Sequence, residues 1–91
     1  MVENTMKQFT YRIREDFNLH FGPAGRLAAR VNCYPDTTAT IEVGGRKENL
    51  SRPIKVAVMG IRKDDLVKVT VEGDSEVELI DVLYQFFEEV M

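Results

Sequence analysis

The residue with the clearest chemical potential in this sequence is its only histidine, His20, in the stretch NLHFGPAG. The periodicity that follows predicts a helix beginning at Phe21, which places His20 in the N-cap region. The backbone N–H groups of Phe21 and Gly22 then have no partner inside the helix, and with the helix dipole they form an anion site. A cation is disfavoured there, so we expect a neutral imidazole with a free nucleophilic nitrogen. This combination is what a phosphoryl acceptor needs.

A structural role explains the same histidine without any chemistry. His20 could cap the helix or simply face solvent, because single histidines are common on protein surfaces. Position alone favours this simpler interpretation, so the choice between the two depends on the rest of the chain.

Composition limits the possible functions. The 91 residues fit one domain over 1–91, in which we expect residues 1–5 to be flexible. The 12 basic and 15 acidic residues give a net charge of -3, which argues against a nucleic-acid binder. The single cysteine, Cys33, excludes an intrachain disulfide and a multi-cysteine metal site. We therefore expect neither metal nor cofactor.

The hydropathy pattern indicates a cytoplasmic protein. No apolar run approaches the roughly 18 residues that span a bilayer. The first residues, MVENTMKQF, lack the basic and then apolar layout of a signal peptide. We expect no membrane insertion and a monomer.

The periodicity of the sequence predicts the elements that must position His20. Apolar and polar residues alternate in the segments 7–14, 37–43 and 66–73, as in strands with one buried face. Gly44-Gly45 predicts a tight hairpin turn before a short edge strand, RKENL. Helical spacing follows Phe21, recurs in the final segment 74–91, and is expected in a short helix with Pro53 in its first turn. The order βαββαβα predicts an α+β fold, with an antiparallel sheet covered on one face by helices.

Several side chains outside the motif have expected structural roles. Tyr11, Phe86 and Phe87 are expected in the core, and Cys33 as a buried or half-buried residue near the end of the first helix. Ser51 is interpreted as the N-cap of the short helix. Ser75 and Glu78 have the spacing of a capping box at the start of the last helix.

From about Phe9 to Phe87, the sequence resembles HPr, the histidine-containing phosphocarrier of the bacterial sugar phosphotransferase system. The family's mark is Gly-Leu/Ile-His-x-Arg-Pro-Ala, and residues 18–24 here read NLHFGPA. The Gly-Gly hairpin, the segment ending in VMG and the VKVTVEG strand also occur in family order. The resemblance implies an open-faced β-sandwich, a four-stranded antiparallel sheet covered on one face by three helices. It also implies that His20 accepts a phosphoryl group on Nδ1 from enzyme I and passes it to enzyme IIA domains, as a stoichiometric intermediate and not a free-standing catalyst.

The sequence departs from the family two residues after the histidine. Gly22 stands where the family has an arginine that neutralises charge on the phosphoryl group, and a glycine cannot supply those hydrogen bonds. Arg26 lies one turn later on the same helix face and could reach back toward the phosphate. A solvated surface role for Arg26 explains it equally well.

The second departure lies in the segment SRPIKVAVMG. Alignment places Arg52 where many family members carry a regulatory serine, so the usual phosphoserine control is not expected. The resemblance implies a partner-docking surface here, comprising Arg52, Pro53, Ile54, Ala57 and Val58. The alternative is that Ile54 or Val58 belongs to the core. Exposed apolar residues beside a reactive group would suit a transient protein interface.

Three classes of function therefore remain open. The first is a phosphocarrier that acts through His20. The second is a regulatory or protein-binding module that has kept the fold and lost efficient transfer, which Gly22 supports. The third is an unrelated module of the same element order that binds a small ligand or RNA, which leaves Leu-His-x-x-Pro-Ala at a helix start unexplained.

Overall fold

The structure, a computed structural model, describes residues 6–14 and 21–90 of the chain. The described residues form seven elements: β1 (Lys7–Arg12), α1 (Phe21–Asn32), β2 (Thr37–Val43), β3 (Arg46–Asn49), α2 (Pro53–Ala57), β4 (Leu66–Gly73) and α3 (Glu76–Val90). The predicted order βαββαβα is confirmed. The flexibility expected for residues 1–5 concerns a part of the chain outside the described residues.

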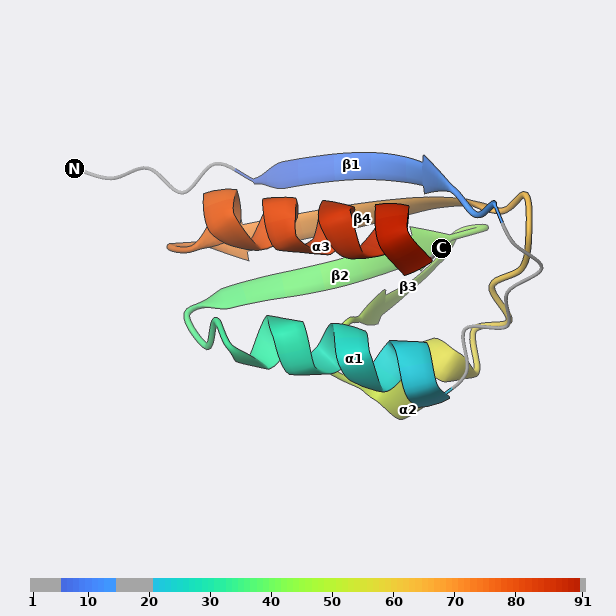
Figure 1. Cartoon of the computed structure of the whole chain (residues 1–91), viewed down its shortest axis with the longest axis horizontal. Coiled ribbons are helices and arrows are strands. Elements are labelled where there is room, and N and C mark those ends of the chain that lie inside the picture. Colours follow the sequence, from blue (N-terminus) through green and yellow to red (C-terminus); the bar gives the residue numbers. More distant parts are fainter. Residues whose placement is uncertain (1–5, 15–20, 91) are drawn as a thin grey trace.

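The four strands form one antiparallel sheet in the order β1-β4-β2-β3. The three helices all lie over the same face of this sheet (Figure 1). Helix α3 packs on β1 and β4, whereas α1 contacts β2 and both other helices. The predicted open-faced sandwich is therefore confirmed, and none of the described helices lies on the second sheet face.

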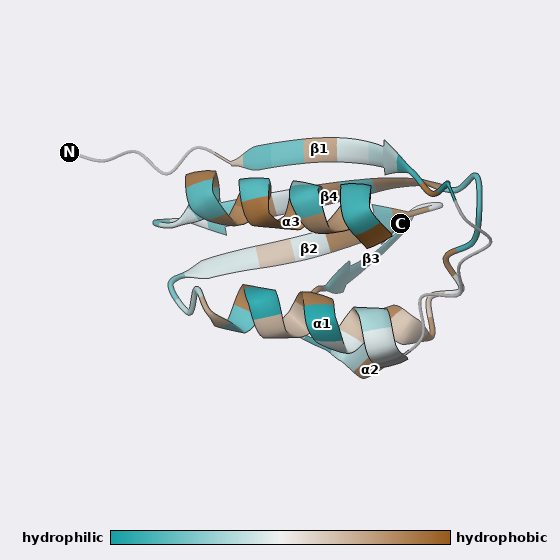
Figure 2. Cartoon of the chain, in the orientation of Figure 1, coloured by the Kyte–Doolittle hydropathy of each residue, from teal (hydrophilic) through white to brown (hydrophobic). Residues whose placement is uncertain are grey.

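The helix-covered face of the sheet holds the core. On β4, Val67, Val69 and Val71 are fully buried, and Lys68 and Thr70 alternate with them on the uncovered face. Figure 2 shows the matching apolar residues on the sides of α1 and α3 that face the sheet. Tyr11, Phe86 and Phe87 are buried as predicted. The period of two in the strands and of 3.6 in the helices thus identified the buried faces.

The hairpin between β2 and β3 follows the sequence prediction. Gly44 has φ of 55° and Gly45 has φ of 79°, the left-handed region that glycine adopts without a steric penalty. The pair reverses the chain so that Val43 lies opposite Arg46. The short strand β3 lies at the edge of the sheet, as its charged sequence predicts.

The predicted capping box at α3 is wrong. The Ser75 hydroxyl donates to Asp36 Oδ2 at 3.3 Å, and the Ser75 N–H donates to Thr37 Oγ1 at 2.8 Å. Glu78 accepts a hydrogen bond from the Tyr34 hydroxyl instead of turning back to Ser75. Partial desolvation raises the pKa of Tyr34, and the negative charge of Glu78 raises it further. Both residues of the expected box therefore join α3 to the loop before β2.

Two expectations near α1 and α2 are also wrong. Cys33 is exposed, because it lies beyond the last helical residue, Asn32. Its thiol donates to Ala29 O at 3.4 Å.

Arg52, and not Ser51, is the N-cap of α2, and no side chain caps that end. The Ser51 hydroxyl is held 2.7 Å from Asn49 Oδ1, which also accepts the Ser51 N–H at 2.9 Å. Asn49 thus occupies the group that would have capped the helix.

Candidate functional site

The candidate site begins where α1 begins. His20, its expected acceptor, lies outside the described residues, and so does the side chain of Phe21. The helix starts at Phe21, as predicted, and continues for 12 residues. The N–H groups of Phe21 and Gly22 belong to its first turn, where a helix offers donors without internal partners. The structure therefore places the expected anion cradle directly after His20 in the chain.

The space around Gly22 is open. Gly22 is exposed, and a Cβ atom added to it would have no heavy atom within 4 Å among the described residues, apart from its chain neighbours and the backbone of its own helix. Pro23 follows in the first turn, where its missing N–H costs no helical hydrogen bond. An approaching protein therefore meets backbone at this position, and a larger side chain would also fit.

The side chain of Arg26 lies over α3. Its Cζ atom is 5.3 Å from the centroid of the Phe86 ring, and Arg30 Cζ is 4.6 Å from the same centroid. Arg30 also donates a hydrogen bond to Arg26 O at 3.2 Å. In this structure the Arg26 guanidinium is therefore in contact with an aromatic ring of α3.

Long-range contacts fix the chain just before the segment that holds His20. The Ile13 N–H donates to Asp65 O at 2.9 Å, and the Asp64 N–H donates to Ile13 O at 2.8 Å. Arg14 donates to the carbonyl of Glu88 near the end of α3. The sequence alone did not indicate these contacts of Arg14 and Asp64. Their partners are backbone groups that lie roughly 50 to 75 residues away in the chain.

The expected docking surface is exposed as a patch on α2. Ile54 is 64% exposed and Val58 is 72% exposed, so neither belongs to the core. Pro53 and Ala57 are half-buried, and Arg52 is exposed at the start of the helix. Val56 and Met59 hold α2 on the core from the opposite side. We refer to Arg52, Pro53, Ile54, Ala57 and Val58 as the α2 patch.

The α2 patch lies beside the helix whose first turn contains the expected anion cradle, because α1 and α2 pack against each other. The end of α2 is further held by Arg46, which donates to Met59 O. The structure thus brings the two groups of predicted site residues onto neighbouring helices.

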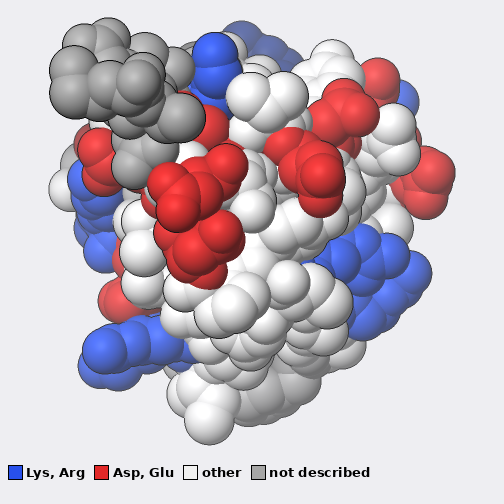
Figure 3. Space-filling view, turned by 90° about the vertical axis from the view of Figure 1, so that its left-hand side faces the viewer, with Lys and Arg blue, Asp and Glu red and all other residues white. Residues whose placement is uncertain are grey.

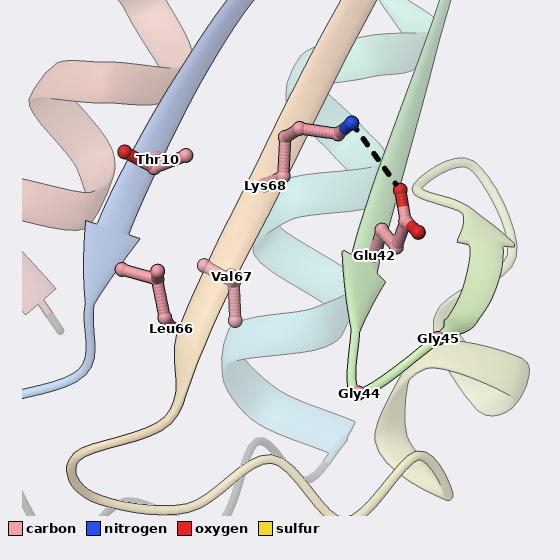
Figure 4. Close-up of a pocket in the computed structure, with 7 residues that line it drawn as sticks. All are labelled: Thr10, Glu42, Gly44, Gly45, Leu66, Val67 and Lys68. Carbon is pink, nitrogen blue, oxygen red and sulfur yellow. Dashed lines mark ion pairs between the residues drawn. The ribbon is translucent and has the colours of Figure 1, made fainter.

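A shallow groove lies on the sheet face that the helices leave uncovered (Figure 4). Thr10, Leu66, Lys68 and Glu42 contribute to its walls. Lys68 Nζ and Glu42 Oε1 are 3.6 Å apart, so their charges compensate each other. The groove contains none of the predicted site residues.

Residues 6–14 and 21–90 contain no group of three or more histidine, cysteine or acidic residues arranged to hold a metal ion. None of the described helices is long and apolar enough to cross a membrane.

Comparison with known proteins gives one family and several solved structures. The family model described as "PTS HPr component phosphorylation site" matches residues 7–89. The chain is 26% identical to HPr-C-His from Thermoanaerobacter tengcongensis, with a TM-score of 0.80, over 90% of this chain and 91% of that one. It is also similar to the histidine-containing phosphocarrier protein of Mycoplasma, with 22% identity, a TM-score of 0.85 and coverage of 91% and 93%. The phosphocarrier protein HPr from Bacillus anthracis str. Ames gives 20% identity, a TM-score of 0.79 and coverage of 91% and 98%.

Proposed function

Because the chain belongs to the HPr family of the phosphotransferase system, we propose that it is a phosphocarrier that accepts a phosphoryl group on His20. Enzyme I is the proposed donor, and enzyme IIA domains are the proposed acceptors. The observation that carries the proposal is the match of a phosphorylation-site family over residues 7–89, combined with a helix that starts one residue after His20.

In the proposed reaction, a phosphoryl group moves from the donor protein to a ring nitrogen of His20. The lone pair of one imidazole nitrogen of His20 attacks the phosphorus, and the bond between phosphorus and the donor breaks with its electron pair leaving on the donor. The N–H groups of Phe21 and Gly22 offer hydrogen bonds to the phosphoryl oxygens. In the second transfer a nucleophilic group of the acceptor attacks the phosphorus, and the bond between phosphorus and the His20 nitrogen breaks with its electron pair returning to the imidazole. No additional reactant is needed.

This carrier role is tested by supplying phosphoenolpyruvate, enzyme I and an isolated enzyme IIA domain. Phosphorylation of the IIA domain should depend on the presence of this chain and should increase with its concentration. A chain that binds enzyme I but passes no phosphate to IIA would contradict the carrier role. That result would favour the binding-module alternative, for which the glycine at position 22 is the supporting observation.

Arg26 is proposed to assist transfer by replacing the arginine that is missing at position 22. Contact between its guanidinium and Phe86 is worth only about 0.5–1 kcal/mol at an exposed site, so a phosphoryl group can compete for it. Arg26→Ala should lower the initial rate of phosphorylation by enzyme I about tenfold, as expected for the loss of one charge-assisted hydrogen bond. Arg62→Ala, which removes another exposed arginine, serves as the control. Equal rates for Arg26→Ala and the unaltered chain would contradict this role.

The α2 patch is proposed to dock enzyme I and enzyme IIA. Ile54→Asp should weaken binding of enzyme I about tenfold, because a buried apolar contact is replaced by a carboxylate that must lose its water. Isothermal titration calorimetry measures this effect in the absence of phosphoenolpyruvate. Val77→Asp provides a matched control, since Val77 is 68% exposed but lies on α3. Equal losses of affinity for enzyme I in Ile54→Asp and Val77→Asp would contradict the proposal that the α2 patch is the docking surface.

A further inference from the structure

Helix α2 and the residues that follow it are apolar around most of the helix circumference. In the sequence PIKVAVM, residues 53–59, the charged side chain is Lys55. Ile54 and Val58 are 64% and 72% exposed, as described above. Val56 and Met59, which are equally apolar in type, are only 1% and 7% exposed. A rotation of α2 about its axis would bury one apolar pair in place of the other, so hydrophobic burial alone does not decide which pair faces outward.

Charge and helix length do not decide the orientation of α2 either. Lys55 is exposed, and among residues 6–14 and 21–90 it has no carboxylate oxygen within 4.0 Å. On the face shown in Figure 3, acidic side chains gather in the upper part of the molecule, whereas the helices α1 and α2 lie at its lower side in Figure 1. Helix α2 has five residues, far fewer than the roughly 12 at which an isolated helix becomes marginally stable. Its orientation therefore depends on contacts at its two ends.

Both ends of α2 are joined to the edge strand β3. Before the helix, the N–H and the hydroxyl of Ser51 both donate to Asn49 Oδ1, at 2.9 Å and 2.7 Å. The Arg52 N–H donates to Asn49 O at 3.1 Å. Beyond the helix, the guanidinium of Arg46 donates to Met59 O. Arg46 and Asn49 are the first and last residues of β3, so one short strand contacts the chain on either side of α2.

The contact of Arg46 differs from those of Asn49 in its reach. The bonds of Asn49 join residues two or three positions apart, so they restrain the local turn and would persist if α2 rotated. Arg46 spans 13 positions to reach Met59. Its own backbone is held by the sheet, where it pairs with Val43 of β2. An arginine at the last carbonyls of a helix is also favoured by the negative end of the helix dipole. Arg46 therefore relates the rotation of α2 to the sheet.

We propose that Arg46 is a positioning residue for partner docking: its bond to Met59 O keeps Ile54 and Val58 on the outer side of α2. Without this bond, α2 also adopts orientations in which Ile54 and Val58 are partly buried. Apparent affinity then falls with the fraction of molecules whose α2 patch faces outward. This inference rests on the proposed function for the identity of the partner, and it adds a residue outside the α2 patch to those that determine docking.

The orientation of α2 is tested on the chain alone, by the relaxation that a soluble gadolinium chelate causes in methyl NMR signals. In the unaltered chain the Ile54 methyl signals should relax far more strongly than the Met59 methyl signal. Arg46→Met keeps an apolar stem but removes the donors, and it should lower this ratio about twofold or more. Arg46→Lys should restore most of the ratio, because an ammonium can also donate to a carbonyl.

Lys47→Met is the matched control, since Lys47 is the neighbouring exposed cation on β3 and has no hydrogen bond to α2 in the described part of the chain. It should leave the methyl ratio unchanged. The methyl groups of Val69, which is fully buried in the sheet, should stay protected in every variant. An unchanged ratio in Arg46→Met, or an equal fall in Lys47→Met, would overturn the proposal. Loss of protection at Val69 to the same extent would assign the effect to general unfolding and would also overturn it.

Docking is tested with the same variants by calorimetric titration of enzyme I. Arg46→Met should weaken binding about two- to threefold, whereas Lys47→Met should not. In phosphorylation assays, KM for the chain should rise by the same factor with kcat unchanged, because positioning of the patch acts on binding and not on the chemical step. Full affinity of Arg46→Met, while Ile54→Asp binds weakly, would overturn the role of Arg46 in docking. If neither variant loses affinity but the methyl ratio still falls, the docking surface of the proposed function is wrong and the control of α2 by Arg46 stands.

Discussion

Replacing His20 with alanine is expected to abolish phosphorylation of the chain by phosphoenolpyruvate and enzyme I. Alanine has no lone pair that can form the bond to phosphorus, and the sequence contains no second histidine to take over. The backbone N–H groups of Phe21 and Gly22 can bind an anion but cannot accept the phosphoryl group covalently. The expected effect is therefore complete loss of acid-labile phosphate, measured on the intact chain by mass spectrometry at neutral pH.

His20→Gln provides the control for this substitution, because it retains a polar side chain at the helix start without an imidazole. It should also carry no phosphate. Both variants should keep the circular dichroism spectrum of the unaltered chain and its affinity for enzyme I. Acid-labile phosphate that persists in His20→Ala would show that another residue is the acceptor and would contradict the proposed site.

Restoring an arginine at position 22 is expected to accelerate phosphorylation about 10- to 100-fold. One hydrogen bond from a charged donor is worth about 1.5–3 kcal/mol, and each 1.36 kcal/mol in a barrier changes the rate tenfold. Among the described residues, the structure gives the new side chain room, because a Cβ at Gly22 has no heavy atom within 4 Å beyond its chain neighbours and its own helix backbone. The initial rate of phosphorylation at limiting enzyme I measures the effect.

Two comparisons show whether the gain comes from the guanidinium. Gly22→Gln should give little or no acceleration, since it adds a side chain without charge. The double variant Gly22→Arg/Arg26→Ala should remain fast, because the new arginine takes over the role proposed for Arg26. A rate for Gly22→Arg no higher than that of Gly22→Gln would show that charge at this position does not limit transfer.

The sequence predicts most of the fold because its patterns are local. The alternation in 66–73 identifies the buried valines of β4, and Gly44-Gly45 identifies the hairpin. The helix start at Phe21 follows from the change of period alone. These features depend on neighbouring residues and on which face is apolar, so they can be predicted without knowledge of tertiary contacts.

The wrong predictions involve partners far apart in the chain or competing local ones. The spacing predicts that Ser75 pairs with Glu78, but Ser75 bonds to Asp36 in the loop before β2 and to Thr37, the first residue of β2. Ser51 bonds to Asn49 rather than capping α2. Short polar side chains have several possible partners, and sequence spacing names only one of them.

The candidate site was predicted only in part, for the same reason. The exposure of Ile54 and Val58 depends on the burial of Val56 and Met59, which sets the side of α2 that faces the core. The contact of Arg26 and Arg30 with Phe86 joins residues more than 50 positions apart, roughly, and no local pattern indicates it.

The central claim, that His20 carries a phosphoryl group, is tested most directly by imidazole NMR of the chain after exposure to phosphoenolpyruvate and enzyme I. With a single histidine in the sequence, the side-chain spectrum contains one imidazole, so its assignment is unambiguous. The account predicts a scalar coupling between phosphorus and one ring nitrogen, which disappears when an enzyme IIA domain is added. An imidazole that shows no coupling to phosphorus, under conditions in which a known HPr becomes phosphorylated, would contradict the account.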